Sequence, residues 1–226
     1  MKIEVKHPWD VDFATARQIQ TELINKVILK APSRFKPRLV SGTDAAYFAD
    51  EKKVLAATVV LTFPDLEIVE ERMSQVPVRF PYRPGLLTFR EGPALIKALL
   101  KVKSHVDLIF IDGQGIAHPR GLGLASHLGI IMDIPTIGCA KTRLVGNFLA
   151  PADFRGASSP LMYEGKVVGA VLRTRAKVKP IFVSPGHRMS VEDAIPLVMA
   201  CSPKYRIPEP VRLAHALAKA AEGKES

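Results

Sequence analysis

Three carboxylates occupy positions where a simple hydrophobic core would not place them. Asp44 lies inside a β-rich run at 39–48, Asp112 directly follows the apolar run 106–111, and Glu91 is turned inward by a helical spacing. Withdrawing a carboxylate from water is costly unless the group is paired or bound to a metal ion. Each acid taken alone is better explained as a cap, a turn residue or a salt-bridged side chain. The order of all three along the chain favours a shared site.

This order is similar to that of the acids in ribonuclease H-like nucleases. One acid lies on the first strand of a meander, the second on the following helix, and the third at the carboxyl end of the next parallel strand, where open α/β sheets place their sites. In that fold the acids converge on divalent cations for phosphodiester hydrolysis. Mg²⁺ prefers oxygen ligands and is usually held by one or two carboxylates plus a substrate phosphate. The acids therefore predict a Mg²⁺ site.

His215 is a candidate fourth member of this site. It lies four residues after Val211 and three before Ala218, so on a helix it shares their apolar face and points inward. A single histidine on an apolar face is usually a core residue. Because the acids also point inward, the residue pattern supports a core residue and a member of the site equally well.

The elements that must position these residues follow from hydrophobic periodicity. Apolar residues recur every three to four positions over 11–29 and predict an amphipathic helix, whereas β-rich runs on either side of the polar turn 49–53 predict an antiparallel pair. The further predictions are strands at 39–48, 54–63, 66–73, 106–111, 135–140 and 179–184, a hairpin with its tip at 163–166 and strands reaching 175, loops at 76–85 and 112–123, and helices at 86–101, 124–132, 191–201 and 208–222.

No internal repeat or linker divides these elements. We therefore expect a single α/β domain over 1–226 with a ribonuclease H-like core at about 37–222. In this core an antiparallel three-strand meander followed by parallel strands forms a central mixed sheet, flanked by helices.

Composition excludes several classes of protein. The 226 residues are 47% hydrophobic, and the mean hydropathy of +0.12 fits a soluble globular chain rather than a disordered or membrane protein. The longest uncharged apolar stretch, 54–64, is too short to span a bilayer. The first ten residues lack the apolar core of a signal peptide, so we expect a cytoplasmic protein. Two cysteines, Cys139 and Cys201, cannot form a disulfide scaffold or a cysteine-rich zinc site.

The excess positive charge lies at the two ends of the sequence. The chain has 32 Lys and Arg against 22 Asp and Glu, a formal net charge of +10. Residues 1–40 hold eight basic and four acidic residues, residues 166–226 hold eleven and five, and residues 41–165 hold thirteen of each. Two explanations remain open, a solvated basic surface and a polyanionic partner such as nucleic acid.

Specific motifs then connect the chain to a known family. They are GTD at 42–44, PYRPGLL at 81–87, FREGP at 89–93, DGQGIAHPR at 112–120, ASH at 125–127, PTIG at 135–138, AK at 140–141, FVSPGH at 182–187, IPEP at 207–210 and RLAH at 212–215. Over nearly its whole length the chain resembles the endonuclease V family of deoxyinosine 3′ endonucleases. The stretch 112–120 is too specific to match by chance.

The resemblance implies a chemistry for the acidic residues. It assigns Asp44, Glu91 and Asp112 as catalytic acids and metal ligands, with Asp44 and Asp112 as the principal ligands of Mg²⁺, for which Mn²⁺ is expected to substitute. His215 is expected to act on the attacking water or on a second metal ion, and Lys141 to lie near the scissile phosphate. The implied activity is two-metal hydrolysis of the second phosphodiester bond 3′ to deoxyinosine, which is deaminated adenine, leaving 3′-hydroxyl and 5′-phosphate ends.

The resemblance also implies a set of lesion-binding residues. Tyr82, on a rigid proline-flanked loop, is suited to fill the gap left by an extruded base. The other residues implied to bind substrate are Pro81, Pro84, Gly85, Leu87, Gly113, Gly123 and His118. Ordinary surface packing of the tyrosine and ordinary turn glycines are the alternatives. In the family's usual form of this loop, an aliphatic residue stands at the position of Arg83. The arginine here predicts an additional contact with a substrate phosphate.

Other functions remain open on the sequence. The same class includes an inosine-RNA-directed ribonuclease and other ribonuclease H-like nucleases, such as a junction resolvase. A different class is a non-catalytic module that binds inosine; the complete set of acids is evidence against it, because binding a polyanion needs no clustered carboxylates. The preferred expectation is a monomeric DNA repair enzyme that acts on DNA containing deoxyinosine and has no membrane partner.

Overall fold

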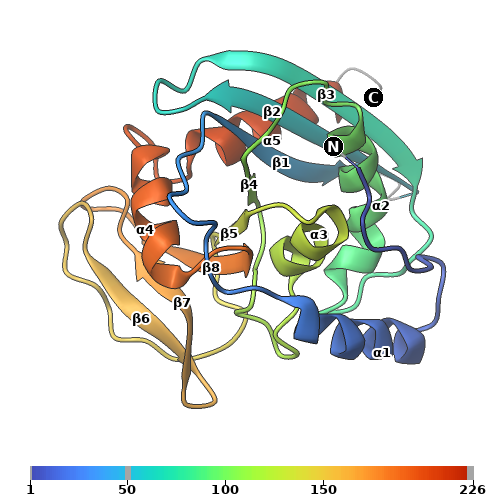
Figure 1. Ribbon diagram of the computed structural model, residues 1–226, viewed down its shortest axis with the longest axis horizontal. Helices are drawn as coiled ribbons and strands as arrows, with labels where there is room; N and C mark the ends of the chain where they lie inside the picture. Colours follow the sequence, from blue (N-terminus) through green and yellow to red (C-terminus); the bar gives the residue numbers. More distant parts are fainter. Residues whose placement is uncertain (1, 49–51, 223–226) are drawn as a thin grey trace.

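The computed structural model describes residues 2–48 and 52–222. Its centre is an eight-stranded sheet in the order β3-β2-β1-β4-β5-β8-β7-β6 (Figure 1). The strands are β1 (Leu39–Tyr47), β2 (Lys53–Thr62), β3 (Ile68–Pro77), β4 (Leu108–Ile111), β5 (Thr136–Ala140), β6 (Ser158–Tyr163), β7 (Lys166–Leu172) and β8 (Ile181–His187). β4 pairs in parallel with both β1 and β5, and the other pairs are antiparallel. The predicted mixed sheet, with its three-strand meander followed by parallel strands, is confirmed.

Helices cover both faces of this sheet. They are α1 (Phe13–Leu23), the 3-10 helix η1 (Ile24–Lys26), α2 (Leu87–Leu100), α3 (Leu124–Met132), α4 (Val191–Ala200) and α5 (Glu209–Glu222). Side chains of β4 alternate between two cores, because Ile109 and Ile111 pack with α2 and α3 whereas Leu108 and Phe110 pack with α4 and α5. The unbroken apolar run of β4 is thus buried on both faces, as in other parallel strands. No helix among the described residues is long and apolar enough to cross a membrane.

The first helix is shorter than its sequence pattern predicts. Periodicity predicts a helix over 11–29, but α1 ends at Leu23 and η1 ends at Lys26. Beyond η1 the chain is extended, and the Ile28 amide donates a hydrogen bond to His187 Nδ1 at the end of β8. This tertiary contact draws the backbone away from the helix, so the helical prediction is wrong for the last residues of 11–29.

Two strands are longer than predicted. β3 continues to Pro77, beyond the predicted end at 73, because its later residues pair with β2. β8 continues to His187, beyond the predicted end at 184, because it pairs with β5 there. The hairpin with its tip at 163–166 is confirmed, although its second strand ends at Leu172 rather than 175. Residues 49–51 of the predicted turn lie outside the described residues, and the remaining elements shift by at most two residues.

Candidate active site

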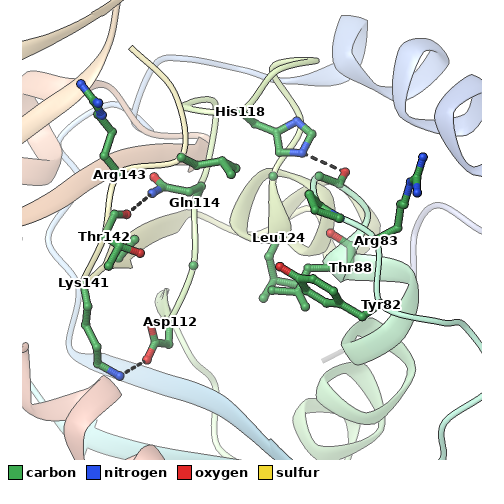
Figure 2. A pocket seen from close by; sticks show the side chains of 17 residues that line it. Tyr82, Arg83, Thr88, Asp112, Gln114, His118, Leu124, Lys141, Thr142 and Arg143 are labelled. Atoms are coloured by element: carbon green, nitrogen blue, oxygen red, sulfur yellow. Dashed lines mark hydrogen bonds and ion pairs between the residues drawn. The ribbon is translucent and has the colours of Figure 1, made fainter. Parts of the chain in front are cut away.

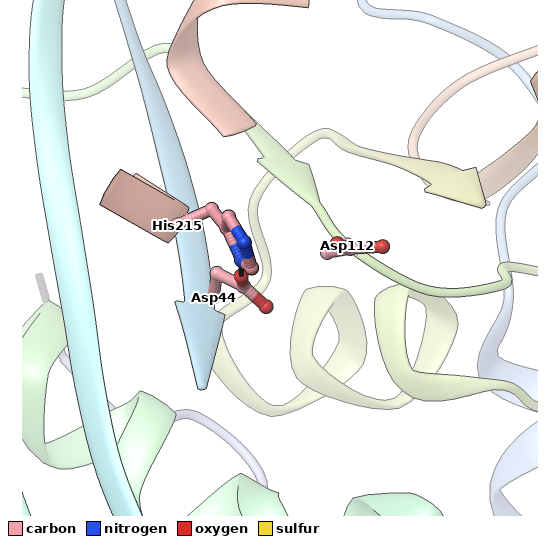
Figure 3. A group of neighbouring side chains, drawn as sticks. All are labelled: Asp44, Asp112 and His215. Atoms are coloured by element: carbon pink, nitrogen blue, oxygen red, sulfur yellow. Dashed lines mark hydrogen bonds and ion pairs between the residues drawn. The ribbon is translucent and has the colours of Figure 1, made fainter. Parts of the chain in front are cut away.

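Two acids and one histidine gather at the carboxyl ends of β1 and β4 (Figure 3). Thr43 of β1 lies opposite Ile111 of β4 in a parallel pair, so the next residues, Asp44 and Asp112, reach the same edge of the sheet. His215 reaches this edge from α5. One ligand atom from each of the three side chains lies within 4.8 Å of the other two. The structure therefore brings together three residues that were predicted to share a site.

One of the acids orients the histidine. His215 Nδ1 lies 2.7 Å from Asp44 Oδ2, while Asp44 Oδ1 accepts a hydrogen bond from the Ala45 amide. Because a carboxylate is an acceptor, neutral His215 carries its proton on Nδ1 and keeps Nε2 as an acceptor; this tautomer is assigned from the hydrogen-bond network. The contact with Asp44 thus leaves His215 with one free basic nitrogen.

The negative charge of this group is only partly balanced. Burial raises the pKa of the Asp44 carboxyl and the charge of Asp112 raises it further, whereas the hydrogen bond with His215 lowers it. At the end of β5, Lys141 Nζ lies 2.6 Å from Asp112 Oδ2 (Figure 2). Two carboxylates that repel each other in a partly buried site, together with an imidazole, fit a divalent cation that prefers oxygen ligands, such as Mg²⁺ or Mn²⁺.

Glu91 lies on α2, close enough to the two aspartates for their charges to act on it. Tyr47 Oη donates a hydrogen bond to Glu91 Oε1 at 2.9 Å, and the Arg90 guanidinium lies over the Tyr47 ring. Burial is the main reason why the pKa of Glu91 is raised to about 8, and the charges of Asp44 and Asp112 add to the effect. Among the described residues Glu91 is not part of the group within 4.8 Å, so its role as a metal ligand stays a prediction.

A cavity of about 450 Å³ opens next to Asp112 and Lys141 (Figure 2). Of the residues predicted to bind the lesion, the cavity is lined by Tyr82, Pro84, Gly85, Leu87, Gly113, Gly123 and His118. Pro81 is not part of this lining. Lining residues that the prediction did not include are Arg83, Thr88, Gln114, Leu124, Ala140, Thr142, Arg143 and Leu144. Tyr82 is 64% exposed and lies at the cavity wall, and its role as a wedge stays a prediction.

The Gly85 carbonyl in the cavity wall is held by three donors. Gln20 Nε2, His118 Nε2 and Arg120 Nη2 lie 3.1, 2.9 and 2.6 Å from this oxygen, and Arg120 Nε also donates to Gln20 Oε1. His118 Nδ1 accepts from the Arg120 amide, so both ring nitrogens are used. Burial first, and the charge of Arg120 second, lower the pKa of His118 to about 4. His118 is therefore a neutral residue that fixes the loop.

Two of the predicted pocket glycines are required by the backbone itself. Gly85 has a φ of +76°, a conformation that favours glycine, and a β-carbon there would lie 2.9 Å from Arg120 Nη2. A β-carbon at Gly123 would lie 2.4 Å from the Gln114 carbonyl oxygen. Close packing of the cavity wall thus explains both glycines, and a contact with a base stays a prediction.

Two positioning residues carried no signal that the sequence analysis could use. Gln20 lies on α1, 65 residues before the carbonyl that it binds, and a buried polar residue inside an amphipathic helix does not reveal its partner. Tyr47 ends a strand, and its contact with Glu91 spans 44 residues. Both contacts are tertiary and lie outside any local pattern.

Comparison with known proteins gives consistent results. The family model described as Endonuclease V matches residues 21–216. Endonuclease V of Nostoc sp. (strain PCC 7120) is 48% identical over 218 residues, which are 96% of this chain and 99% of that protein. Endonuclease V of Alkalilimnicola ehrlichii is 46% identical over 222 residues, 98% of both chains.

Solved structures extend the likeness to three dimensions. Endonuclease V from Streptomyces avermitilis superposes with a TM-score of 0.91 at 41% identity, covering 100% of this chain and 99% of that chain. Endonuclease V from Ciona intestinalis was crystallised with a 23mer DNA that contains an inosine followed by a ribo-adenosine; it gives a TM-score of 0.81 at 29% identity, with 94% and 98% coverage. These neighbours have a ribonuclease H-like fold, which confirms the predicted fold class.

Proposed function

Because the chain belongs to the endonuclease V family and is thus a nuclease, a phosphodiester hydrolase, we propose that it is a Mg²⁺-dependent DNA repair enzyme. It recognises deoxyinosine and hydrolyses the second phosphodiester bond 3′ to it, leaving 3′-hydroxyl and 5′-phosphate ends. One observation carries the proposal: Asp112 belongs both to the acidic group with Asp44 and His215 and to the wall of the cavity beside Tyr82. A metal site for cleavage and a pocket for a base therefore share one residue.

The metal would be held by this chain's acids. Asp44 and Asp112 would be the principal ligands, and the Glu91 carboxylate would join them, because a nearby cation favours the loss of its proton. Mg²⁺ bound there, as two ions in the mechanism we propose, would supply Lewis-acid stabilisation of the oxygens at the reacting phosphorus. Mn²⁺ has similar ligand preferences and should replace it.

The surrounding side chains have roles that follow from their contacts. His215 Nε2 is free to accept the proton of the attacking water, because Nδ1 donates to Asp44. The Lys141 ammonium is held at Asp112 and offsets the negative charge that develops at the phosphate. Neither role needs a residue from a second copy of the chain, so we propose that the enzyme acts as a monomer. We also propose that it acts in the cytoplasm.

The cavity supports recognition of an extruded base. Extrusion costs a few kcal/mol and costs least for a mispaired base such as inosine. Tyr82 is exposed at the rim and can occupy the space left in the duplex, while the base enters the cavity of about 450 Å³. Gly85, whose carbonyl is fixed by three donors, gives one wall a rigid shape.

A nicking assay tests this function. We expect the protein to nick an inosine-containing duplex with Mg²⁺ or Mn²⁺, not with EDTA, and to leave the same duplex with adenine intact. Asp112→Asn or Asp44→Asn should abolish nicking while the fold is kept. Asp65→Asn is the matched control, because it makes the same chemical change at an exposed acid of the β2–β3 turn.

The outcomes separate the alternatives. Faster cleavage of inosine RNA than of inosine DNA would favour an RNA-directed nuclease. Preferential cutting of undamaged junctions would favour another ribonuclease H-like enzyme. Metal-independent binding of inosine DNA without any cleavage would favour a non-catalytic module. Full activity of Asp112→Asn would overturn the assigned site.

A further inference from the structure

A second hollow of the surface is lined by basic residues, at the end of β7 and beside the connection between α4 and α5. Its volume is about 310 Å³, and it is lined by Arg155, Thr174, Arg175, Pro203, Lys204 and Tyr205. We call it the basic pocket. Part of the positive surplus of residues 166–226 lies here, because Arg175 and Lys204 belong to that segment. In Figure 1 the neighbouring elements β6, β7 and α4 lie away from α1.

Acids of the described chain do not balance the charges of the basic pocket. Neighbouring Arg173 lies 3.3 Å from Asp153, and Arg212 lies 2.6 Å from Glu209. Within the described part of the chain, no carboxylate oxygen lies within 4.0 Å of the charged nitrogens of Arg155, Arg175, Lys204 or Arg206. The fold thus gathers positive charge without carboxylate partners in one hollow, where Lys204 Nζ lies 5.5 Å from the centre of the Tyr205 ring, while it neutralises adjacent arginines.

Arg155 in the pocket wall and the neighbouring Arg206 are both fixed by neutral groups. Arg155 Nη2 donates to the carbonyls of Met199 and Ser202, and Arg206 Nη2 donates to those of Lys141 and Pro180 at 3.0 and 2.9 Å. Burial lowers the pKa of the Arg206 guanidinium, as expected for a cation without a counter-ion. A guanidinium held in place in this way is preorganised to bind a phosphate, whose oxygens match its donors.

The basic pocket is joined to the active site by a short series of contacts. Lys141 binds Asp112 through its ammonium group, and its carbonyl accepts a hydrogen bond from Arg206. The Arg206 carbonyl in turn accepts from Thr174 Oγ1 at 2.7 Å, and Thr174 is part of the pocket wall. These contacts tie the wall of the basic pocket, through Arg206, to the lysine that binds Asp112.

We propose that the basic pocket binds a backbone phosphate of the substrate nucleic acid, at a nucleotide outside the lesion cavity. The inference rests on the proposed nuclease function, since it takes the strand held at Asp112 as the ligand. A phosphate contact is independent of sequence, so the basic pocket should contribute affinity and salt dependence and should not select the base. Basic residues of the segment 166–226 thus bind the nucleic acid backbone, at a place separate from the lesion cavity.

Binding measurements without metal test the proposal. The double variant Arg175→Ala/Lys204→Ala removes two exposed charges of the pocket. Fluorescence anisotropy with a labelled inosine duplex in EDTA, over a salt series, should give about tenfold weaker binding for each phosphate that the variant no longer binds. The slope of log affinity against log salt should fall by about 0.9 for each of these phosphates.

The matched control removes the same charge elsewhere. Lys97 and Lys103 are both exposed. Lys97 lies near the end of α2 and Lys103 lies between α2 and β4, on the side where β4 begins, whereas Asp112 follows the end of β4. The variant Lys97→Ala/Lys103→Ala should keep the wild-type slope. A duplex truncated until it no longer reaches the basic pocket should be bound equally by the wild type and by the pocket variant.

Three results would overturn the inference. They are an unchanged slope in the pocket variant, an equal decrease of the slope in the control variant, and a difference that persists on the truncated duplex. Failure of the nuclease proposal is a separate observation, the absence of nicking of inosine DNA by the wild type with Mg²⁺. The comparison of the salt-dependence slopes needs no cleavage. It therefore tests whether the basic pocket binds a phosphate, whether or not the protein nicks inosine DNA.

Discussion

A β-carbon on Gly42 would lie 1.9 Å from the carbonyl oxygen of Pro210, so β1 and α5 meet backbone to backbone. This close approach lets α5 lie against the strand that carries Asp44, where His215 forms its 2.7 Å hydrogen bond. The glycine therefore sets the distance between Asp44 and the histidine beside it. Any side chain at position 42 must displace the start of α5.

Gly42→Ala is predicted to reduce both stability and activity. We expect a decrease of about 1–3 kcal/mol in the free energy of unfolding, which is typical of overpacking. Single-turnover nicking of inosine DNA should fall at least tenfold, because His215 moves away from Asp44. Gly165→Ala is the control: its φ of +74° makes alanine unfavourable, but nothing lies within 4 Å of the new β-carbon at this hairpin tip. The control should lose stability and keep its nicking rate, and an equal rate in Gly42→Ala would show that this glycine does not position His215.

Much of the site could be predicted because it depends on short patterns. Asp112 follows an apolar run that is typical of a buried strand, and parallel strands place their carboxyl ends at one edge, so its meeting with Asp44 followed from topology. His215 was placed by helical spacing from Val211, which is indeed buried in the core. In each case a local pattern and one rule of chain geometry indicated the position, whereas the role in a shared site was implied by the family resemblance.

The parts that could not be predicted depend on contacts between distant segments. The helix at 11–29 ends early because Ile28 binds His187, a residue on β8. Gln20 reaches Gly85 and thereby couples α1 to the cavity. Neither partner can be recognised from a single sequence, because a polar residue in a helix has many possible acceptors in three dimensions.

Glu91→Gln is predicted to change how stability depends on pH. Without metal, the pKa of Glu91 is raised from its ordinary 4.5 to about 8, mainly by burial. The folded state therefore holds this proton more tightly than the unfolded state, and the resulting stabilisation is lost as pH rises from about 4.5 to about 8. Glutamine resembles the protonated acid and removes this pH-dependent decrease. The variant should exceed the wild type in stability by about 4 kcal/mol at pH 8 in EDTA, because each unit of pKa difference corresponds to about 1.4 kcal/mol.

Urea unfolding at several pH values, with and without Mg²⁺, measures this effect. The exposed acid Glu67 provides the control Glu67→Gln, which should follow the wild type. Mg²⁺ should stabilise the wild type more than Glu91→Gln, because only the wild type adds a carboxylate at position 91 to those of Asp44 and Asp112. Parallel pH profiles of the wild type and Glu91→Gln would count against a buried, protonated Glu91.

Gln20→Leu is predicted to weaken discrimination between inosine and adenine. Gln20 is fully buried, donates to the Gly85 and Leu122 carbonyls and accepts from Arg120 Nε. Leaving these groups unpaired should cost about 1–3 kcal/mol of stability and loosen the cavity wall. The ratio of the dissociation constants for adenine and inosine duplexes, measured in EDTA, should fall several-fold.

A second substitution at the same position separates positioning from a simple decrease in stability. Gln20→Glu keeps an acceptor for Arg120 but turns a carboxylate oxygen toward the Gly85 carbonyl. It should recover part of the stability and none of the discrimination. If both variants discriminate as well as the wild type, the hydrogen bonds at Gly85 do not shape the lesion pocket.

Arg83→Ile is predicted to keep cleavage and weaken binding. Arg83 lines the cavity next to Tyr82, and its guanidinium lies 5.5 Å from the centre of the Phe13 ring on α1. The structure thus offers two roles, a phosphate contact and packing of the loop on α1. A phosphate contact requires that the slope of log affinity against log salt fall by about 0.9 in Arg83→Ile. Phe13→Leu removes the ring and keeps the charge, so it should retain the slope. An unchanged affinity of Arg83→Ile across the salt titration would reject the phosphate contact and leave packing as the role of Arg83.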